Sequence, residues 1–215
     1  MPSRSADDKA AALPNPDAAI HPTLVTSRLV LRPIVAEDVN DLHDAFADPE
    51  TMRFMDFPPA LSVADSARYL AIYVFPLPDW HATWALVCRQ TRIVMGFVNY
   101  HHRETWNHRL EVGFLLGRPY WKRGLMSEAL DAVLEYCFER LEIERVEVTM
   151  SPDNDNAVRL AERLGFQRES GLMSRRQRVA TGYRDQSMYS LLRDEWRGSA
   201  PTTGQTAAPS DDGCR

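Results

Sequence analysis

One segment in the middle of the chain has the strongest helical periodicity, and strand-like runs at 109–117 and 145–151 flank it. The apolar positions of this helix are Met126, Leu130, Val133, Leu134, Cys137 and Leu141, and the acidic positions on its other side are Glu128, Asp131, Glu135 and Glu139. A helix with one apolar face packs on a sheet. A strand–helix–strand crossover brings its two strands parallel in that sheet, so the chain should fold as an α/β protein.

The remaining segments extend this pattern to a single domain. Apolar and polar positions alternate over 24–34 at the period of a half-buried strand. Pro49 should end the first helix, Ser62 is the predicted N-cap of the second, and Gly165 should close the last. In chain order, the predicted elements are a strand over 24–34, helices over 35–48 and 62–75, an antiparallel meander over 83–89, 92–102 and 109–117, the long helix, a strand over 145–151, a short helix over 156–166, and strands over 167–179 and 184–192.

Composition limits the class of protein. With 44% hydrophobic and 26% charged residues, the chain has an ordinary soluble, globular composition. Residues 1–22 and 198–215 are poor in large apolar side chains, so we expect disordered tails around a domain at 23–197. No apolar run approaches the ~20 residues that span a bilayer, and the N-terminus lacks the apolar region of a signal peptide. We expect no membrane association.

The cysteines indicate the compartment. Cys88, Cys137 and Cys214 are odd in number, lie far apart and form no C-x-x-C motif. Neither a disulfide framework nor a cysteine-based zinc site fits that pattern. The sequence therefore predicts a reduced, cytoplasmic protein.

A short basic stretch stands out from an acidic background. The net charge is −5, from 25 basic and 30 acidic side chains, so the surface as a whole gives no reason to expect nucleic acid. Lys122, Arg123 and Gly124 nevertheless come directly before the long helix, whose first N–H groups and dipole favour an anion such as phosphate. The alternative is a solvated basic pair with a glycine that only serves the turn. The spacing of Gly117 and Gly124 fits neither a P-loop nor a dinucleotide-binding motif.

Two stretches around this loop resemble the GNAT acetyltransferases, particularly the branch of the ribosomal-protein N-terminal and spermidine acetyltransferases. They read "EVGFLLGRPYWKRGLMSEALDAVLEYCF" and "VTMSPDNDNAVRLAERLGF", and the likeness runs from about Leu24 to Trp196. Asn154, the "LGF" and the later "GYRDQSMYSLLRDEW" also match in order and spacing. The resemblance implies a mixed, mostly antiparallel sheet of six to seven strands flanked by helices, with a central parallel pair splayed to hold the cofactor.

The resemblance also implies acetyl-coenzyme A as the acetyl donor. The family pyrophosphate loop, Q/R-x-x-G-x-G/A, falls on residues 121–126, with Met126 in place of the usual small residue. The pantetheine arm should bond to the main chain of the first splayed strand and to the Asn154 side chain. The cofactor-binding residues so implied are Phe114, Leu115, Leu116, Trp121, Lys122, Arg123, Gly124, Leu125, Met126, Ser127 and Asn154.

The catalytic groups follow the family less closely. Many members carry a Tyr or a Ser that protonates the leaving thiolate, at the positions where this chain has Ala161 and Ala157. The thiolate's acid is therefore unassigned. Glu111 resembles an acidic position of the branch and is the predicted base, the alternative being a solvent-facing strand carboxylate. Tyr183 is a further candidate for substrate contact or proton transfer.

Two neighbouring histidines, His101 and His102, lie on a predicted strand. Because successive strand residues point to opposite faces, at most one of them should face the substrate, and the pair should make a poor metal site. We therefore expect no metal.

These features predict direct transfer of an acetyl group to a primary amine, either a protein N-terminus or a small molecule. Aromatic and acidic groups between the first two helices are where the family recognises its acceptor, although most should serve packing; they include Phe54, Asp56, Phe57 and Tyr69. The competing hypothesis, motivated by the missing Tyr and Ser, is a non-catalytic acetyl-coenzyme A-binding or interaction protein. The oligomeric state stays open, with a homodimer as one expectation.

Overall fold

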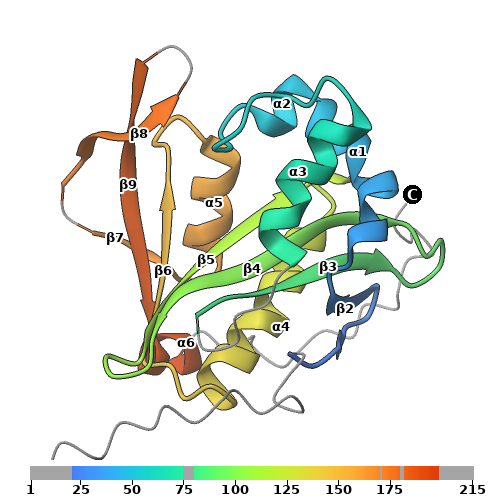
Figure 1. Ribbon diagram of the computed structural model, residues 1–215. Helices are drawn as coiled ribbons and strands as arrows, with labels where there is room; N and C mark the ends of the chain where they lie inside the picture. The colour runs from blue at the N-terminus through green and yellow to red at the C-terminus, as the bar shows by residue number, and fades with distance from the viewer. Residues whose placement is uncertain (1–20, 75–79, 170, 180–181, 199–215) are drawn as a thin grey trace, which may run out of the picture.

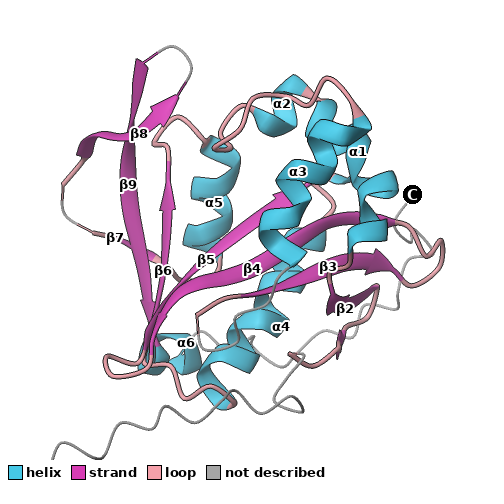
Figure 2. Ribbon diagram, viewed as in Figure 1, coloured by secondary structure: helices cyan, strands magenta, loops and turns pink. Residues whose placement is uncertain are grey.

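A nine-stranded mixed sheet runs through the centre of the molecule (Figures 1 and 2). The computed structural model describes residues 21–74, 80–169, 171–179 and 182–198. The strands of the sheet lie in the order β1-β2-β3-β4-β5-β6-β9-β7, and β8 pairs with β9. Their bounds are β1 (Leu24–Val25), β2 (Leu29–Pro33), β3 (Ala82–Cys88), β4 (Val94–Glu104), β5 (Arg109–Leu116), β6 (Arg145–Met150), β7 (Gln167–Arg168), β8 (Met173–Val179) and β9 (Gly182–Leu192).

The strand pairing confirms the predicted topology. β3, β4 and β5 form an antiparallel meander, and β5 pairs with β6 in parallel across the predicted crossover. The sheet has more strands than the six to seven expected, because two predicted strands are each broken into two. The one over 24–34 divides into β1 and β2, and the one over 167–179 into β7 and β8.

Helices cover both faces of the sheet. Their bounds are η1 (Ala36–Asp38), α1 (Val39–Ala47), α2 (Pro49–Met52), α3 (Val63–Val74), η2 (Arg118–Tyr120), α4 (Leu125–Glu139), α5 (Asp155–Arg163) and α6 (Arg193–Gly198). Side chains of α1, α2 and α3 form one apolar core with Phe97 and Leu115 of the sheet. Side chains of α4 and α5 form the other, with Val112 and Val148 among its strand residues. Figure 1 accordingly shows α1 and α3 in front of the central strands and α4 behind them.

Local sequence signals explain most of the helix ends. Asp48 adopts an extended conformation and accepts a hydrogen bond from the Thr51 N–H at 3.0 Å, so Pro49 begins a new helix and the predicted stop before it is confirmed. α5 is followed by Gly165 with φ +91°, as the sequence predicts. α4 ends at Glu139, so Leu141 lies in the next turn and not in the helix.

The folded unit begins earlier than the sequence indicates. His21 is buried, with Nε2 2.7 Å from the Thr83 carbonyl oxygen, and the Trp84 indole N–H donates to the Pro22 carbonyl oxygen at 2.8 Å. Both residues were expected in the tail. Residues 1–20 and 199–215, including Cys214, lie outside the described residues.

Two further expectations bear on the described ranges. Cys88 and Cys137 are buried free thiols. Within those ranges, none of the helices has the length and apolar character needed to cross a membrane.

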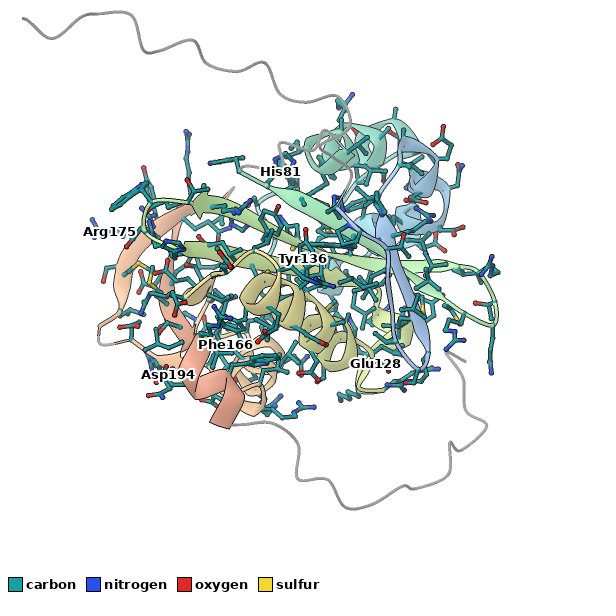
Figure 3. All side chains as sticks on the ribbon, turned by 90° about the horizontal axis from the view of Figure 1, so that it is seen from below. His81, Glu128, Tyr136, Phe166, Arg175 and Asp194 are labelled. Carbon is teal, nitrogen blue, oxygen red and sulfur yellow. The ribbon has the colours of Figure 1, made fainter. Side chains whose placement is uncertain are left out.

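The start of α4 is tied to the turn between β1 and β2. The Glu128 carboxylate accepts hydrogen bonds from Thr26 Oγ1 at 2.5 Å, Ser27 Oγ at 2.9 Å, and Arg28 N and Nε at 2.8 and 2.7 Å. Arg28 Nη1 also donates to the Arg123 carbonyl oxygen at 2.9 Å. Figure 3 shows Glu128 beside that turn. One carboxylate therefore holds an N-terminal turn, the first turn of α4 and the loop before it together.

Replacing this carboxylate should weaken the fold in a pH-dependent way. Burial alone raises the pKa of Glu128, but hydrogen bonds from Thr26 and Arg28 outweigh burial, and the pKa lies below its ordinary value. Glu128→Gln should therefore cost about 1–2 kcal/mol of unfolding free energy near neutral pH. A lowered carboxyl pKa stabilises the fold above the unfolded-state pKa, and this share is lost as the pH falls through the folded-state pKa.

Thermal unfolding of both proteins across the acidic range measures this effect. The melting temperatures of the native chain and Glu128→Gln should converge as the pH falls. The matched control is Glu135→Gln, which changes an exposed carboxylate of the same helix and should melt like the native chain at every pH. Equal melting of the two variants near neutral pH would contradict the proposed tie.

Candidate active site

The parallel strands β5 and β6 separate partway along their length. Their pairing ends at the Glu111–Glu147 row, although β5 continues to Leu116 and β6 to Met150. Backbone N–H and C=O groups in a sheet need partners, and those that face the opening have none from the neighbouring strand. The opening is therefore a main-chain binding edge in the middle of the sheet.

The strand register shows which groups of β5 face this edge. An added Cβ on Gly96 of β4 would lie 2.1 Å from the Leu115 carbonyl oxygen, so that carbonyl points toward β4. Because backbone groups of successive strand residues point to opposite edges, Val112, Phe114 and Leu116 point toward the opening. The Leu116 carbonyl oxygen already accepts from the Trp121 indole N–H at 2.6 Å. Phe114 therefore fits the predicted role best, and Val112 is a further candidate that the sequence analysis did not name.

The predicted phosphate loop lies at the start of α4. Lys122 and Gly124 both have left-handed backbone angles, with φ +60° and +73°. Alternation of left- and right-handed residues turns successive N–H groups toward one point, which makes an anion-binding concavity. The first helical hydrogen bond runs from Glu128 N to Gly124 O, and no side chain of the described residues caps the helix. The N–H groups before Glu128 thus remain for a ligand.

The side chains of this loop leave that concavity clear. An added Cβ on Gly124 would meet only the Arg28 guanidinium, at 3.6 Å, within the usual contact range. Met126, which replaces the family's small residue, is buried in the core with α5, so the substitution does not block the main chain. Ser127 Oγ is buried without a hydrogen-bond partner among the described residues, and a buried hydroxyl of this kind calls for a ligand or water.

The other face of the sheet carries a polar floor at the end of the opening where the strands still pair. In the register of β3, β4 and β5, Thr83 lies beside Asn99, and His101 lies beside Glu111. His81 comes directly before β3, and the pairing of Ala82 with Tyr100 places it beside His101. Both ring nitrogens of His81 and Thr83 Oγ1 are buried without a partner among the described residues. These groups define a second polar binding region, on the side of α1 and α3.

Burial also affects the histidines of this floor. It lowers the pKa of His81. It lowers the pKa of His101 too, against the opposing effect of Glu111. Neutral imidazoles at this depth can accept protons as well as donate hydrogen bonds.

His101 and His102 do not point to opposite faces, so that prediction is wrong. The register shifts between His101 and Glu104, and His102 has φ +52°. This β-bulge adds a residue to one strand and breaks the alternation of side chains. Both rings consequently lie beside one carboxylate: His101 Nε2 is 3.7 Å and His102 Nδ1 3.4 Å from Glu111 Oε2.

Comparison with known proteins agrees with this geometry. A model of the acetyltransferase (GNAT) domain matches residues 28–167. An uncharacterised N-acetyltransferase, p20, from Bacillus licheniformis is 30% identical over 82% of this chain and 99% of its own. The solved structure of a candidate acetyltransferase from T. thermophilus has 26% identity and a TM-score of 0.75, covering 84% of this chain and 94% of that one. A candidate ribosomal-protein-serine acetyltransferase from Vibrio cholerae has 27% identity and a TM-score of 0.69, covering 79% and 97%.

The chain belongs to the GNAT acetyltransferase family. It is thus an enzyme of the N-acetyltransferase type, and the mixed sheet with its splayed parallel pair is the GNAT fold.

The far side of the GNAT opening holds fewer polar groups than the family pattern implies. Asn154 caps α5, where its Oδ1 accepts from the Ala157 N–H at 3.3 Å, and its amide nitrogen remains for a ligand. Ala157 and Ala161 are both buried in the α4–α5 core. The structure therefore places no hydroxyl at either position from which family members protonate the thiolate.

Of the predicted acceptor residues, some pack against each other and others contact the β8–β9 hairpin. Phe57 stacks on Tyr69 with ring centroids 4.7 Å apart, so both serve mainly as packing. Asp56 accepts a hydrogen bond from Gln177 of β8. Phe54 lies beneath the Arg184 guanidinium of β9, 5.3 Å from the ring centroid. The segment after α2 and the β8–β9 hairpin are therefore in contact through these side chains.

Tyr183 lies away from this arrangement. It pairs with Arg178 near the end of the β8–β9 hairpin, and 65% of it is exposed. No hydrogen bond joins its hydroxyl to another described residue. Its role in substrate contact or proton transfer stays a prediction.

Proposed function

We propose that this GNAT enzyme transfers an acetyl group from acetyl-coenzyme A directly to a primary amine. The observation that carries the proposal is the opening between β5 and β6, which begins at Glu111 and leads to the unpaired N–H groups before α4. A ligand with a thioester at one end of an amide-containing arm and a pyrophosphate at the other matches both parts. Neither NAD nor ATP combines these features.

The chain's own residues would divide the binding of this donor between them. N–H groups between Lys122 and Ser127 would hold the pyrophosphate, with the positive end of the α4 dipole behind them. Main-chain groups of Phe114 and the Asn154 amide would bond to the pantetheine arm from the two sides of the opening. The Ser127 hydroxyl, which is buried without a partner among the described residues, and the absence of backbone atoms close to an added Cβ on Gly124 support this assignment.

Glu111 is the proposed proton acceptor. It sits in the last paired row of β5 and β6, with its carboxylate on the polar floor. Glu111 would take a proton from the ammonium group, directly or through water, and the free amine would attack the thioester carbon. A main-chain N–H of the splayed β5 would stabilise the oxyanion. When the C–S bond breaks, the thiolate would take its proton from solvent, because Ala157 and Ala161 offer none.

The acceptor is a small molecule or a protein N-terminus. The name of the Vibrio cholerae relative, a ribosomal-protein-serine acetyltransferase, favours a protein acceptor. The competing hypothesis of a non-catalytic acetyl-coenzyme A-binding protein rests on the missing thiolate donor. Thiol release with a panel of amines and N-terminal peptides separates the two, since only an enzyme releases thiol in proportion to an added amine. Free buried thiols favour a cytoplasmic setting for the reaction.

The first test is ligand-dependent stabilisation. Acetyl-coenzyme A should raise the melting temperature, whereas NAD and ATP should do so much less. Linkage predicts ~2.7 kcal/mol of stabilisation at roughly a hundredfold excess over the dissociation constant. Equal stabilisation by all three ligands would indicate a general phosphate site and count against the donor assignment.

The second test concerns the phosphate loop. Gly124→Val should reduce affinity for acetyl-coenzyme A by about tenfold or more, ~1.4 kcal/mol, because a β-branched side chain resists φ +73° and would disturb the loop proposed to hold the pyrophosphate. Calorimetric titration measures this loss. Gly171→Val is the matched control, since Gly171 also has positive φ, +97°, but lies in open space away from the loop. If both variants bind equally well, the phosphate site lies elsewhere.

The third test separates the two predicted catalytic residues. Glu111→Gln should lower turnover by ~10²-fold, the low end for loss of a general base, with little change in donor affinity. Tyr183→Phe should cost less than about tenfold, because the thiolate can leave without a dedicated acid. Steady-state kinetics on the best amine from the panel provide the comparison. A nearly silent Glu111→Gln together with a severe Tyr183→Phe would make Tyr183 the proton-transfer residue.

A further inference from the structure

Two imidazole rings and one carboxylate converge where the β-bulge of β4 meets β5. They belong to His101, His102 and Glu111, and one ligand atom from each lies within 4.8 Å of the other two. We propose that these three side chains form a binding site for a divalent transition-metal ion, with zinc the best match. The proposal departs from the sequence-based expectation of no metal, which rested on the two rings facing opposite ways.

The distances are close to those of a zinc site. Zinc binds imidazole nitrogen and carboxylate oxygen at ~2.0–2.1 Å, so tetrahedral ligand atoms lie ~3.4 Å apart. Glu111 Oε2 lies 3.4 Å from His102 Nδ1 and 3.7 Å from His101 Nε2. All three ligand atoms lie within 4.8 Å of one another, so the side chains would have to rotate inward to bind one ion. Two nitrogens and one carboxylate oxygen form the ligand set of open zinc sites, which keep a fourth position for water or another ligand.

The backbone conformation at His102 places both imidazole rings on one side of the sheet, which regular strand alternation would exclude. A left-handed φ of +52° at His102 is uncommon for a residue other than glycine, although His is enriched there. A conformation of this kind persists where the surrounding structure holds it, and it clusters at functional sites. Its effect here is to turn the His102 ring to the side of Glu111, with 4.8 Å between the two His ring centroids.

Neighbouring side chains can orient the two rings. The Asn99 amide nitrogen, Nδ2, lies 3.3 Å from His101 Nδ1. The two ends of an amide are assigned from its hydrogen bonds, and a half-turn of this side chain brings its oxygen to the ring. In that orientation the amide would accept the Nδ1 proton and leave the Nε2 lone pair for a metal, the arrangement that ligating histidines usually have. The Trp80 ring packs edge-on against His102, with centroids 5.3 Å apart. The Glu111 and His101 side chains are only 20% and 26% exposed, so water screens their charges incompletely.

A metal at this site would act on acetyl transfer through Glu111. A carboxylate that ligates a zinc ion is no longer free to take a proton from an ammonium group, so zinc should inhibit the enzyme. This consequence rests on the proposed function of Glu111, whereas binding of the metal does not. The fourth position of such an ion would take water or an amine.

The deciding experiment is a zinc titration of the tag-free chain with Cys214 replaced by Ser. That substitution removes a thiol outside the described residues that could bind zinc by itself, while Cys88 and Cys137 are buried. A single site with micromolar or tighter affinity is expected, and cobalt(II) should give the intense visible bands of a tetrahedral ion. His102→Asn and Glu111→Gln should each weaken binding by roughly tenfold or more, at least the loss seen when a ligand's supporting partner is removed.

His108→Asn is the matched control. It changes an exposed histidine of the same β4–β5 hairpin that lies outside the cluster, and zinc affinity should stay unchanged. Asn also tolerates positive φ, so His102→Asn should keep the bulge. The proposal is overturned if the chain binds no zinc at micromolar concentration, or if His102→Asn and Glu111→Gln bind it as tightly as His108→Asn.

Thiol release measured with and without zinc tests the metal site and the catalytic role of Glu111 separately. Zinc should inhibit thiol release, and a chelator or the His102→Asn substitution should relieve the inhibition. If no amine in the panel supports thiol release, the proposed function fails, yet the titration still decides the metal site. If zinc binds with the expected variant pattern but leaves turnover unchanged, Glu111 is not the proton acceptor.

Discussion

The site depends on one constraint: the backbone groups of β5 and β6 must find partners, and beyond the Glu111–Glu147 row they do not find them in each other. A buried charge network fixes that row. The Glu147 carboxylate is buried and accepts hydrogen bonds from Arg109 Nη1 and Arg145 Nε, each at 2.7 Å. Shifting the strands at this row would separate Glu147 from an arginine partner and leave a buried charge uncompensated, which is costly. The opening therefore starts at a defined place relative to Glu111.

Much of this arrangement could be predicted from periodicity. The long amphipathic helix between two strand-like runs specified the parallel pair, and the short runs before it specified the meander; both are confirmed. The row at which the pair separates could not be predicted, because pairing depends on contacts between distant segments. The same holds for the carbonyl direction at Leu115, which follows from its register with Gly96 and not from its residue type.

The errors in the sequence analysis have physical causes of the same kind. Side-chain alternation holds only while a strand stays regular, and the bulge at His102 ends that regularity within a run that otherwise reads as a strand. The pattern also located Tyr183 before the last strand, but β9 begins at Gly182, and its pairing with β8 carries Tyr183 to the exposed end of the hairpin. The only local sequence signal for the bulge at His102 was the residue type itself, because His adopts positive φ more readily than most residues. That signal is too weak to predict a bulge.

The sheet separates two tasks, and this separation explains which departures from the family pattern matter. The proposed donor binding relies on main-chain groups of β5 and the α4 start, so Met126 can point into the core without altering it. Proton transfer needs side chains, and Ala157 and Ala161 remove them from the α5 side. On the opposite face, the polar floor gathers a carboxylate, several imidazoles and buried polar atoms that lack partners among the described residues. Since a buried polar group without a partner is costly, a substrate, water or metal ion should satisfy these atoms, and the chemistry that distinguishes this enzyme should lie on that face.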